Sequence, residues 1–326
     1  MSLTENMSPG LALGIHRTMV RIRVFESRVE ELFKAGKLPG FVHTYIGQEA
    51  IAAGVCAALD RNDYITSTHR GHGHAIAKGM ELGPIMAELY GKATGACRGR
   101  GGSMHVADFS VGMLGANGIV AGGLGIAAGA ALSARYRGTH QVAVGFFGDG
   151  GINKGTFHEA LNFAATHRLG VVFVCENNQY AQFTSRLRTT SVEDLSVRAS
   201  AYGIPGITVD GNDAAATYRE ALEAVGRARD GGGPTLLNME TYRFGGHYVG
   251  DAEVYRASAE VEARRQADPI LRWERTLTDE ALMTAGLGEA VWAEAADEVS
   301  AAVRFAEESP HPDGGTALEN VFTQVC

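Results

Sequence analysis

The fold of this chain is decided by Val142-Ala143-Val144-Gly145-Phe146-Phe147-Gly148-Asp149-Gly150. Its apolar run predicts a buried strand that ends at a Gly-Asp-Gly turn. Residues 171–175 form a second apolar run, which ends at an Asn pair, and residues 155–165 between the two runs have a helical pattern. The stretch therefore predicts a strand–helix–strand unit with polar side chains at the carboxyl ends of both strands, where open parallel sheets bind ligands.

The oxygens at these two strand ends suit a hard cation. An Asp149 carboxylate and an Asn178 amide oxygen are donors of the kind that Mg²⁺ prefers, and Mg²⁺ usually completes its shell with water and substrate phosphates. Gly150 and Gly151 let the backbone approach a phosphate closely, and the following helix can direct N–H groups at the anion. We therefore predict a metal–diphosphate site. The alternative is that Asp149 caps a helix and the Asn pair makes a turn.

The rest of the pattern extends this unit into one α/β domain over residues 1–326. Further helices are expected at 10–36, 48–59, 83–91, 212–229 and 288–308, and further strands at 64–67, 208–210 and 235–240. The glycine-dense stretch 91–129 is expected to form loops that contact a ligand, and residues 69–74 a histidine-rich turn. The expected fold is an open parallel sheet flanked by helices: an N-terminal helical region at 1–60, the core sheet and ligand loops at 61–250, and a C-terminal helical extension at 251–326.

Composition argues against several classes of protein. A net charge of −8 with interspersed signs disfavours nucleic acid or an anionic membrane as a partner. The four cysteines lie far apart without a Cys-x-x-Cys pair, which disfavours a disulfide framework or a structural zinc site. The apolar run near the amino end, Leu11-Ala12-Leu13, is too short for a signal peptide core, and the most apolar stretch, residues 124–134, is shorter than a membrane span. We expect a cytoplasmic enzyme without a membrane or nucleic-acid partner.

Several histidines are candidates for chemistry. His69, His72 and His74 lie within six residues, but their spacing suits no single helix face, and no cysteine or carboxylate accompanies them, so we do not expect a zinc site there. His43 taken alone is more typical of a core or capping residue. His247 lies beside glycines after an apolar strand, where it is well placed to move and to transfer protons near neutral pH.

Longer strings carry a resemblance to a known family. The Gly-Asp-Gly turn, its spacer and the Asn pair look like the thiamine diphosphate motif. The further strings are His43-Thr44-Tyr45-Ile46-Gly47-Gln48-Glu49-Ala50, Gly101-Gly102-Ser103-Met104-His105, Gly115-Ala116-Asn117-Gly118-Ile119-Val120, Gly155-Thr156-Phe157-His158-Glu159-Ala160-Leu161-Asn162, Glu176-Asn177-Asn178-Gln179-Tyr180 and Thr241-Tyr242-Arg243-Phe244-Gly245-Gly246-His247. From about Thr18 to about Phe305, the chain resembles the alpha subunit of the decarboxylating component of 2-oxoacid dehydrogenase complexes. Within that family, residues 67–74, 112–117 and 246–251 are most similar to acetoin dehydrogenase alpha subunits.

The resemblance implies a thiamine-diphosphate-binding fold, its diphosphate-binding domain, with thiamine diphosphate and Mg²⁺ as cofactors. It implies that three histidines lie at the reactive end of the cofactor as catalytic residues, namely His43, His69 and His247. It implies that Arg70 and the backbone N–H groups of Gly150 and Gly151 contact the diphosphate, and that the backbones of Gly118 and Val120 meet the aminopyrimidine. The implied metal ligands are the side chains of Asp149 and Asn178 and the carbonyl of Tyr180. It assigns no role to His72, His74, His105 or His158.

The resemblance also implies partners. A beta subunit, in an α2β2 arrangement, would carry the pyrimidine-binding domain and the glutamate that activates the cofactor, and a lipoyl domain of an acyltransferase would accept the acyl group. The expected substrate is a small carbonyl compound, acetoin first and a 2-oxoacid such as pyruvate second. The alternatives are a carboligating biosynthetic enzyme and a non-catalytic scaffold subunit. Gln182 stands where many relatives place an apolar residue, so the substrate stays open. A dinucleotide-binding dehydrogenase is disfavoured because we find no Gly-x-Gly-x-x-Gly after the first strand with an acid about 20 residues on.

Overall fold

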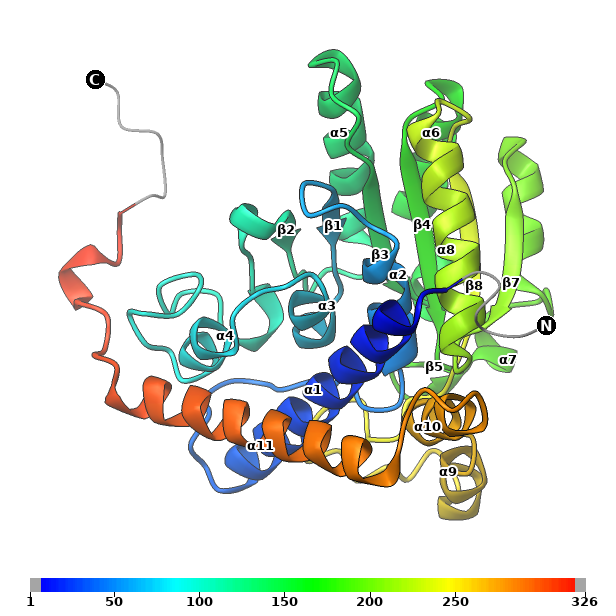
Figure 1. Ribbon diagram of the computed structural model, residues 1–326. Helices are drawn as coiled ribbons and strands as arrows, with labels where there is room; N and C mark the ends of the chain where they lie inside the picture. The colour runs from blue at the N-terminus through cyan, green and yellow to red at the C-terminus, as the bar shows by residue number, and fades with distance from the viewer. Residues whose placement is uncertain (1–6, 320–326) are drawn as a thin grey trace.

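Six parallel strands form one sheet in the computed structural model, which describes residues 7–319 (Figure 1). The strand order is β2-β1-β3-β4-β8-β7, and every neighbouring pair is parallel. The bounds are β1 Tyr64–Thr66, β2 Met113–Gly115, β3 Ala143–Gly148, β4 Val171–Asn177, β7 Gly206–Asp210 and β8 Thr235–Glu240. A separate antiparallel pair consists of β5 Tyr180–Ala181 and β6 Thr184–Ser185. The predicted open parallel sheet is confirmed.

The central strands are apolar on both faces because helices cover both faces. Every residue of β4 is buried, as expected for a strand inside a parallel sheet. The helix bounds are α1 Pro9–Lys34, α2 Glu49–Ala57, α3 Gly71–Ala77, α4 Leu82–Leu89, α5 Gly122–Tyr136, α6 Gly155–Thr166, α7 Arg186–Thr189, α8 Ala214–Arg229, α9 Ser258–Arg265, α10 Pro269–Asp279 and α11 Ala285–Glu308. One apolar cluster joins the sheet to α5 and α6. A larger one joins it to α1, α2, α3 and α8.

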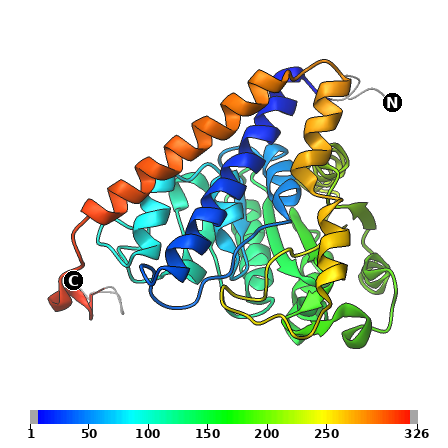
Figure 2. The same ribbon diagram turned by 90° about the horizontal axis from the view of Figure 1, so that it is seen from below.

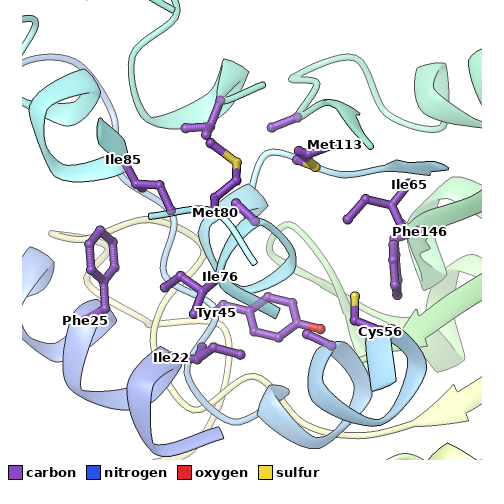
Figure 3. Packing of buried hydrophobic residues seen from close by; sticks show 14 of the residues in the cluster. Ile22, Phe25, Tyr45, Cys56, Ile65, Ile76, Met80, Ile85, Met113 and Phe146 are labelled. Carbon is purple, nitrogen blue, oxygen red and sulfur yellow. The ribbon is translucent and has the colours of Figure 1, made fainter. Parts of the chain in front are cut away.

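The N- and C-terminal helices form an outer layer. The long helices α1 and α11 contact each other and run side by side, as both views show (Figures 1 and 2). Helix α1 begins with Pro9 after Ser8, whose hydroxyl accepts a hydrogen bond from the Leu11 amide, a typical start of a helix. Ile22 and Phe25 of α1 lie in the same apolar cluster, where Ile22 points toward Ile76 of α3 (Figure 3). None of the described helices combines the length and apolarity that crossing a bilayer requires.

Two local expectations need correction. The glycine-dense stretch does supply loop residues to the cavity described below, but it also contains strand β2 and the start of α5. Its small residues allow close packing there, since a Cβ on Gly123 of α5 would lie 3.0 Å from the Thr66 hydroxyl oxygen of β1. The histidine-rich run forms helix α3 from Gly71 onward. There a Cβ on Gly73 would lie 2.3 Å from the Tyr45 ring, so glycine permits the contact. Tertiary packing therefore outweighs the low helix propensity of glycine at both places.

Candidate functional site

A cavity of about 470 Å³ opens at the carboxyl ends of β1, β3 and β4. Its walls come from the loops that follow these strands and from the loops that precede α2 and follow β8. Every residue predicted for the site lines it, namely His43, His69, Arg70, Gly118, Val120, Asp149, Gly150, Gly151, Asn178, Tyr180 and His247. Residues from widely separated parts of the chain therefore meet in one place, as the geometry of a parallel sheet requires.

Asp149 lies at one end of the cavity and is buried. Within residues 7–319, its Oδ2 atom has no hydrogen-bond partner. Burial raises the pKa of this carboxyl to about 6, although the charge of Arg243 opposes the rise. A buried carboxylate oxygen without a partner is costly unless a cation or a proton joins it. The helix-capping alternative is not supported at α6, because the N-cap residue of that helix is Lys154.

Asn178 and the glycine turn complete this end. The Asn178 Nδ2 atom donates to Gln48 Oε1 over 3.0 Å, and its Oδ1 accepts from the Tyr180 amide over 3.3 Å, which fixes the amide plane. A Cβ on Gly150 would lie 2.8 Å from the Ala181 Cβ, so this backbone needs glycine to approach as closely as it does. The carboxylate, the oriented amide and the open backbone fit a hard cation that carries phosphate ligands.

Two buried arginines make the cavity positive. Arg70 donates to the carbonyl oxygens of Thr44 and His247 over 2.6 and 2.7 Å, and so ties together the two loops that carry His43 and His247. Burial, assisted by the charge of Arg243, lowers the Arg70 pKa to about 9, so the guanidinium is still charged at neutral pH. Arg243 donates to the Gln182 carbonyl and the Tyr255 hydroxyl. Two fixed guanidinium groups suit a phosphate-bearing ligand.

Three histidines from three separate loops gather in the wall of the cavity. The ring centroids lie 4.7 Å apart for His43 and His69, 4.9 Å for His43 and His247, and 5.3 Å for His69 and His247. Burial, followed by the charge of Arg70, lowers the pKa of His43 to about 3 and that of His247 to about 4, and lowers the pKa of His69 as well. All three imidazoles are therefore neutral at pH 7, and the lowered pKa values make each of them a weak base in the cofactor-free chain.

The other two histidines of the run point elsewhere. His72 lies between Glu26 and Ser103, with both contacts at 3.0 Å. His74 lies 2.7 Å from the Ser67 hydroxyl and 3.0 Å from Glu176, which also accepts a hydrogen bond from the buried Tyr45 hydroxyl. Both rings are fully buried and use both nitrogens. Because His72 and His74 use both ring nitrogens in these contacts, neither offers a free nitrogen to a ligand beside His69.

Several lining residues were not predicted as site residues, namely Thr68, Met104, Asn117, Lys154, Gln182 and Arg243. Arg243 is the most consequential because it brings a second buried cation. The sequence did hold one indication of its role: Arg243 follows a predicted strand and belongs to the family string that ends with His247. Which way its side chain points depends on Tyr255 and on the Gln182 turn, and the sequence pattern does not indicate either contact.

Comparison with known proteins places this geometry in a family. Residues 17–314 match the model of the dehydrogenase E1 component. The chain is 50% identical, over 99% of its length and 95% of the relative, to the alpha subunit of acetoin:2,6-dichlorophenolindophenol oxidoreductase from Bacillus subtilis. It is 45% identical, over 95% of its length and 93% of the relative, to the subunit of the same name from Cupriavidus necator. It is also 40% identical, over 96% of its length and 89% of the relative, to the pyruvate dehydrogenase E1 alpha subunit of Rhizobium meliloti.

Proposed function

The chain belongs to the dehydrogenase E1 component family as a thiamine-diphosphate-dependent alpha subunit, and we propose that it cleaves acetoin together with a beta subunit. The observation that carries the proposal is the make-up of one cavity. An unpaired, buried Asp149 carboxylate lies at one end, and three neutral imidazoles gather on another part of its wall. A 2-oxoacid such as pyruvate is the second candidate substrate.

Asp149, Asn178 and the Tyr180 carbonyl would hold Mg²⁺ in this proposal. The orphaned Asp149 oxygen and the oriented Asn178 amide support it, since Mg²⁺ takes oxygen ligands and leaves room for phosphate oxygens. Gly150 and Gly151 would present backbone N–H groups to the diphosphate, and the Arg70 guanidinium would add its charge. Gly118 and Val120 would meet the aminopyrimidine through their backbones. Bound thiamine diphosphate supplies the nucleophilic carbon that adds to a substrate carbonyl.

The neutral histidines favour a hydroxyketone over an oxoacid. When an α-hydroxyketone is split, the carbon–carbon bond breaks, the hydroxyl group loses its proton, and an aldehyde leaves. A 2-oxoacid loses carbon dioxide instead and has no hydroxyl proton to give up. His43, His69 and His247 line the cavity and are uncharged at neutral pH, so a ring nitrogen can accept the hydrogen bond of that hydroxyl group, even though the lowered pKa values make the rings weak bases. This difference supports acetoin as the leading substrate.

The rim of the cavity supports the need for a partner subunit. Ile119 and Val120 line the cavity and are 71% and 48% exposed, and Phe183, whose ring lies 5.6 Å from that of His247, is 43% exposed. Exposed apolar side chains grouped in this way are typical of a surface that a partner covers. Asp149 is the only carboxylate among the described residues that line the cavity. The glutamate that activates the cofactor would therefore come from the beta subunit, in an α2β2 assembly. A lipoyl domain would accept the acyl group, and the assembly would be cytoplasmic.

The test is an assay of the chain with and without its candidate beta partner, with acetoin and pyruvate as substrates and a dye as electron acceptor. We expect turnover only with the partner present, and faster turnover with acetoin. If pyruvate were turned over and acetoin were not, pyruvate would replace acetoin as the proposed substrate. Product formation from two carbonyl compounds without any acceptor would favour the carboligating alternative. Loss of cofactor binding in every condition would favour the scaffold alternative.

A further inference from the structure

The three cavity histidines form a ligand set as well as a hydrogen-bond-accepting group. One ring nitrogen from each of His43, His69 and His247 lies within 4.8 Å of the other two. The residues come from the loop between α1 and α2, the loop between β1 and α3, and the loop after β8. Arg70 bonds the first and third loops together, so the cluster is already assembled before any ligand arrives.

Two ring nitrogens of these residues are buried without a partner. In the described part of the chain, His43 Nδ1 and His69 Nε2 have no hydrogen bond, and the His43 residue as a whole is 7% exposed. His72 and His74, in the same sequence run, use both nitrogens on carboxylates and hydroxyls. The contrast marks the cavity histidines as the ones with lone pairs free to bind a ligand.

Imidazole nitrogens select a different metal from the oxygens of Asp149. Zinc and its neighbours bind histidine nitrogen at about 2.0–2.1 Å, and open zinc sites use three protein ligands with one position left for water. Tetrahedral geometry at that bond length sets the nitrogens about 3.3 Å apart. Rotation of the three rings can reach that spacing from the present separations of up to 4.8 Å. Mg²⁺ prefers oxygen and would stay at Asp149.

The arginines limit the strength of such a site. Arg70 Nη2 lies 3.4 Å from His247 Nδ1, so the other ring nitrogen of His247 is the one available to a metal. The guanidinium charges of Arg70 and Arg243 repel a divalent cation. A histidine that binds zinc usually donates its other ring N–H to a hydrogen-bond acceptor, but the group beside His247 is the Arg70 guanidinium, which is a donor. Binding should therefore be reversible.

From this balance we propose that His43, His69 and His247 form a second, inhibitory metal site for a borderline divalent transition ion such as Zn²⁺. The ion would fill the space that the substrate needs and would bind the ring nitrogens that otherwise face the substrate. Excess Zn²⁺ should therefore inhibit the enzyme while Mg²⁺ supports it. Binding of the metal can be measured without thiamine diphosphate or a beta subunit, whereas its inhibitory effect rests on the proposed function.

The experiment is a titration of the full chain, in saturating Mg²⁺, with Co²⁺ as a spectroscopic probe. We expect the strong visible absorption of four-coordinate cobalt at one ion per chain, removed by added Zn²⁺. Removing a residue that only hydrogen-bonds to a metal ligand typically lowers metal affinity by about 10- to 100-fold. Removing a ligand itself, as in His69→Phe or His43→Gln, should therefore weaken cobalt binding by about 100-fold or more. Circular dichroism checks that each variant is folded.

Two matched variants separate this site from others. His158→Gln removes an exposed histidine outside the cavity and should leave the cobalt spectrum unchanged. Asp149→Asn removes the oxygen site and should also leave it unchanged. The proposal is overturned if only the weak absorption of six-coordinate cobalt is seen, or if the signal survives in both His69→Phe and His43→Gln. It is equally overturned if Asp149→Asn abolishes the signal.

Discussion

Replacing Asp149 with Asn should stabilise the cofactor-free chain while abolishing its metal site. The carboxyl is 1% exposed, and Oδ2 has no partner among the described residues. Its pKa is raised from 3.8 to about 6, mainly by burial. Because each pKa unit is worth about 1.4 kcal/mol, the charged carboxylate costs the native state about 3 kcal/mol. Asn keeps the shape and removes the charge, so the gain should be up to about 3 kcal/mol at pH 8.

The sign of the pH dependence follows from the raised pKa. The folded carboxyl holds its proton more tightly than the unfolded one, so the cost is fully present above pH 6 and disappears below pH 3.8. In metal-free buffer, the advantage of Asp149→Asn over the wild type should therefore shrink as the pH falls from 8 to 4. Urea unfolding at several pH values measures it.

A second buried aspartate provides the control. Asp63 pairs with Arg229 over 2.7 Å and accepts the Val142 amide, so Asp63→Asn should destabilise the chain at pH 8. If Asp149→Asn also destabilised the chain by more than about 1 kcal/mol at pH 8, or if its effect did not change with pH, the buried carboxylate would not be unpaired and the reasoning would fail.

The other predictions concern packing, anion binding and proton transfer. Gly73→Ala should lower the free energy of unfolding by about 1–3 kcal/mol, since its Cβ would lie 2.3 Å from the Tyr45 ring, whereas Gly226→Ala, with open space around it in α8, should raise it by about 0.5–1 kcal/mol. Arg70→Lys should weaken thiamine diphosphate binding by about tenfold or more in calorimetry, because one ammonium cannot replace a guanidinium that bonds two loops. His247→Gln should slow acetoin cleavage by about 100-fold. In the wild type, the contribution of His247 should be constant from pH 6 to 8 and fall toward pH 4, as its imidazole gains a proton.

The central sheet could be predicted because parallel strands have a simple signature. Continuous apolar runs at β3 and β4, each followed by polar residues, place Asp149 and Asn178 at one edge without any knowledge of tertiary contacts. Two of the helices that the pattern did not indicate, α3 and α5, are rich in glycine. Local propensity disfavours them, and only contacts such as that of Gly73 with Tyr45 explain why they form.

The sequence indicated residues that line one cavity, but it did not indicate how they are arranged there. The family resemblance indicated His43, His69 and His247, yet their spacing in the sequence does not show that the rings touch, because each lies on a different loop. Arg243 was missed for a related reason. Its direction is set by the Tyr255 hydroxyl and the Gln182 carbonyl, which come from loops that no periodic pattern predicts.

The central claim, a metal–diphosphate site built on Asp149, is tested most directly by calorimetric titration of thiamine diphosphate into this chain with its candidate beta partner, with and without Mg²⁺. We expect tight binding that requires Mg²⁺, is weak or absent without the partner, and is lost in Asp149→Asn while that variant remains folded. Binding that is unchanged by removing Mg²⁺ or by the Asp149→Asn substitution would contradict the account.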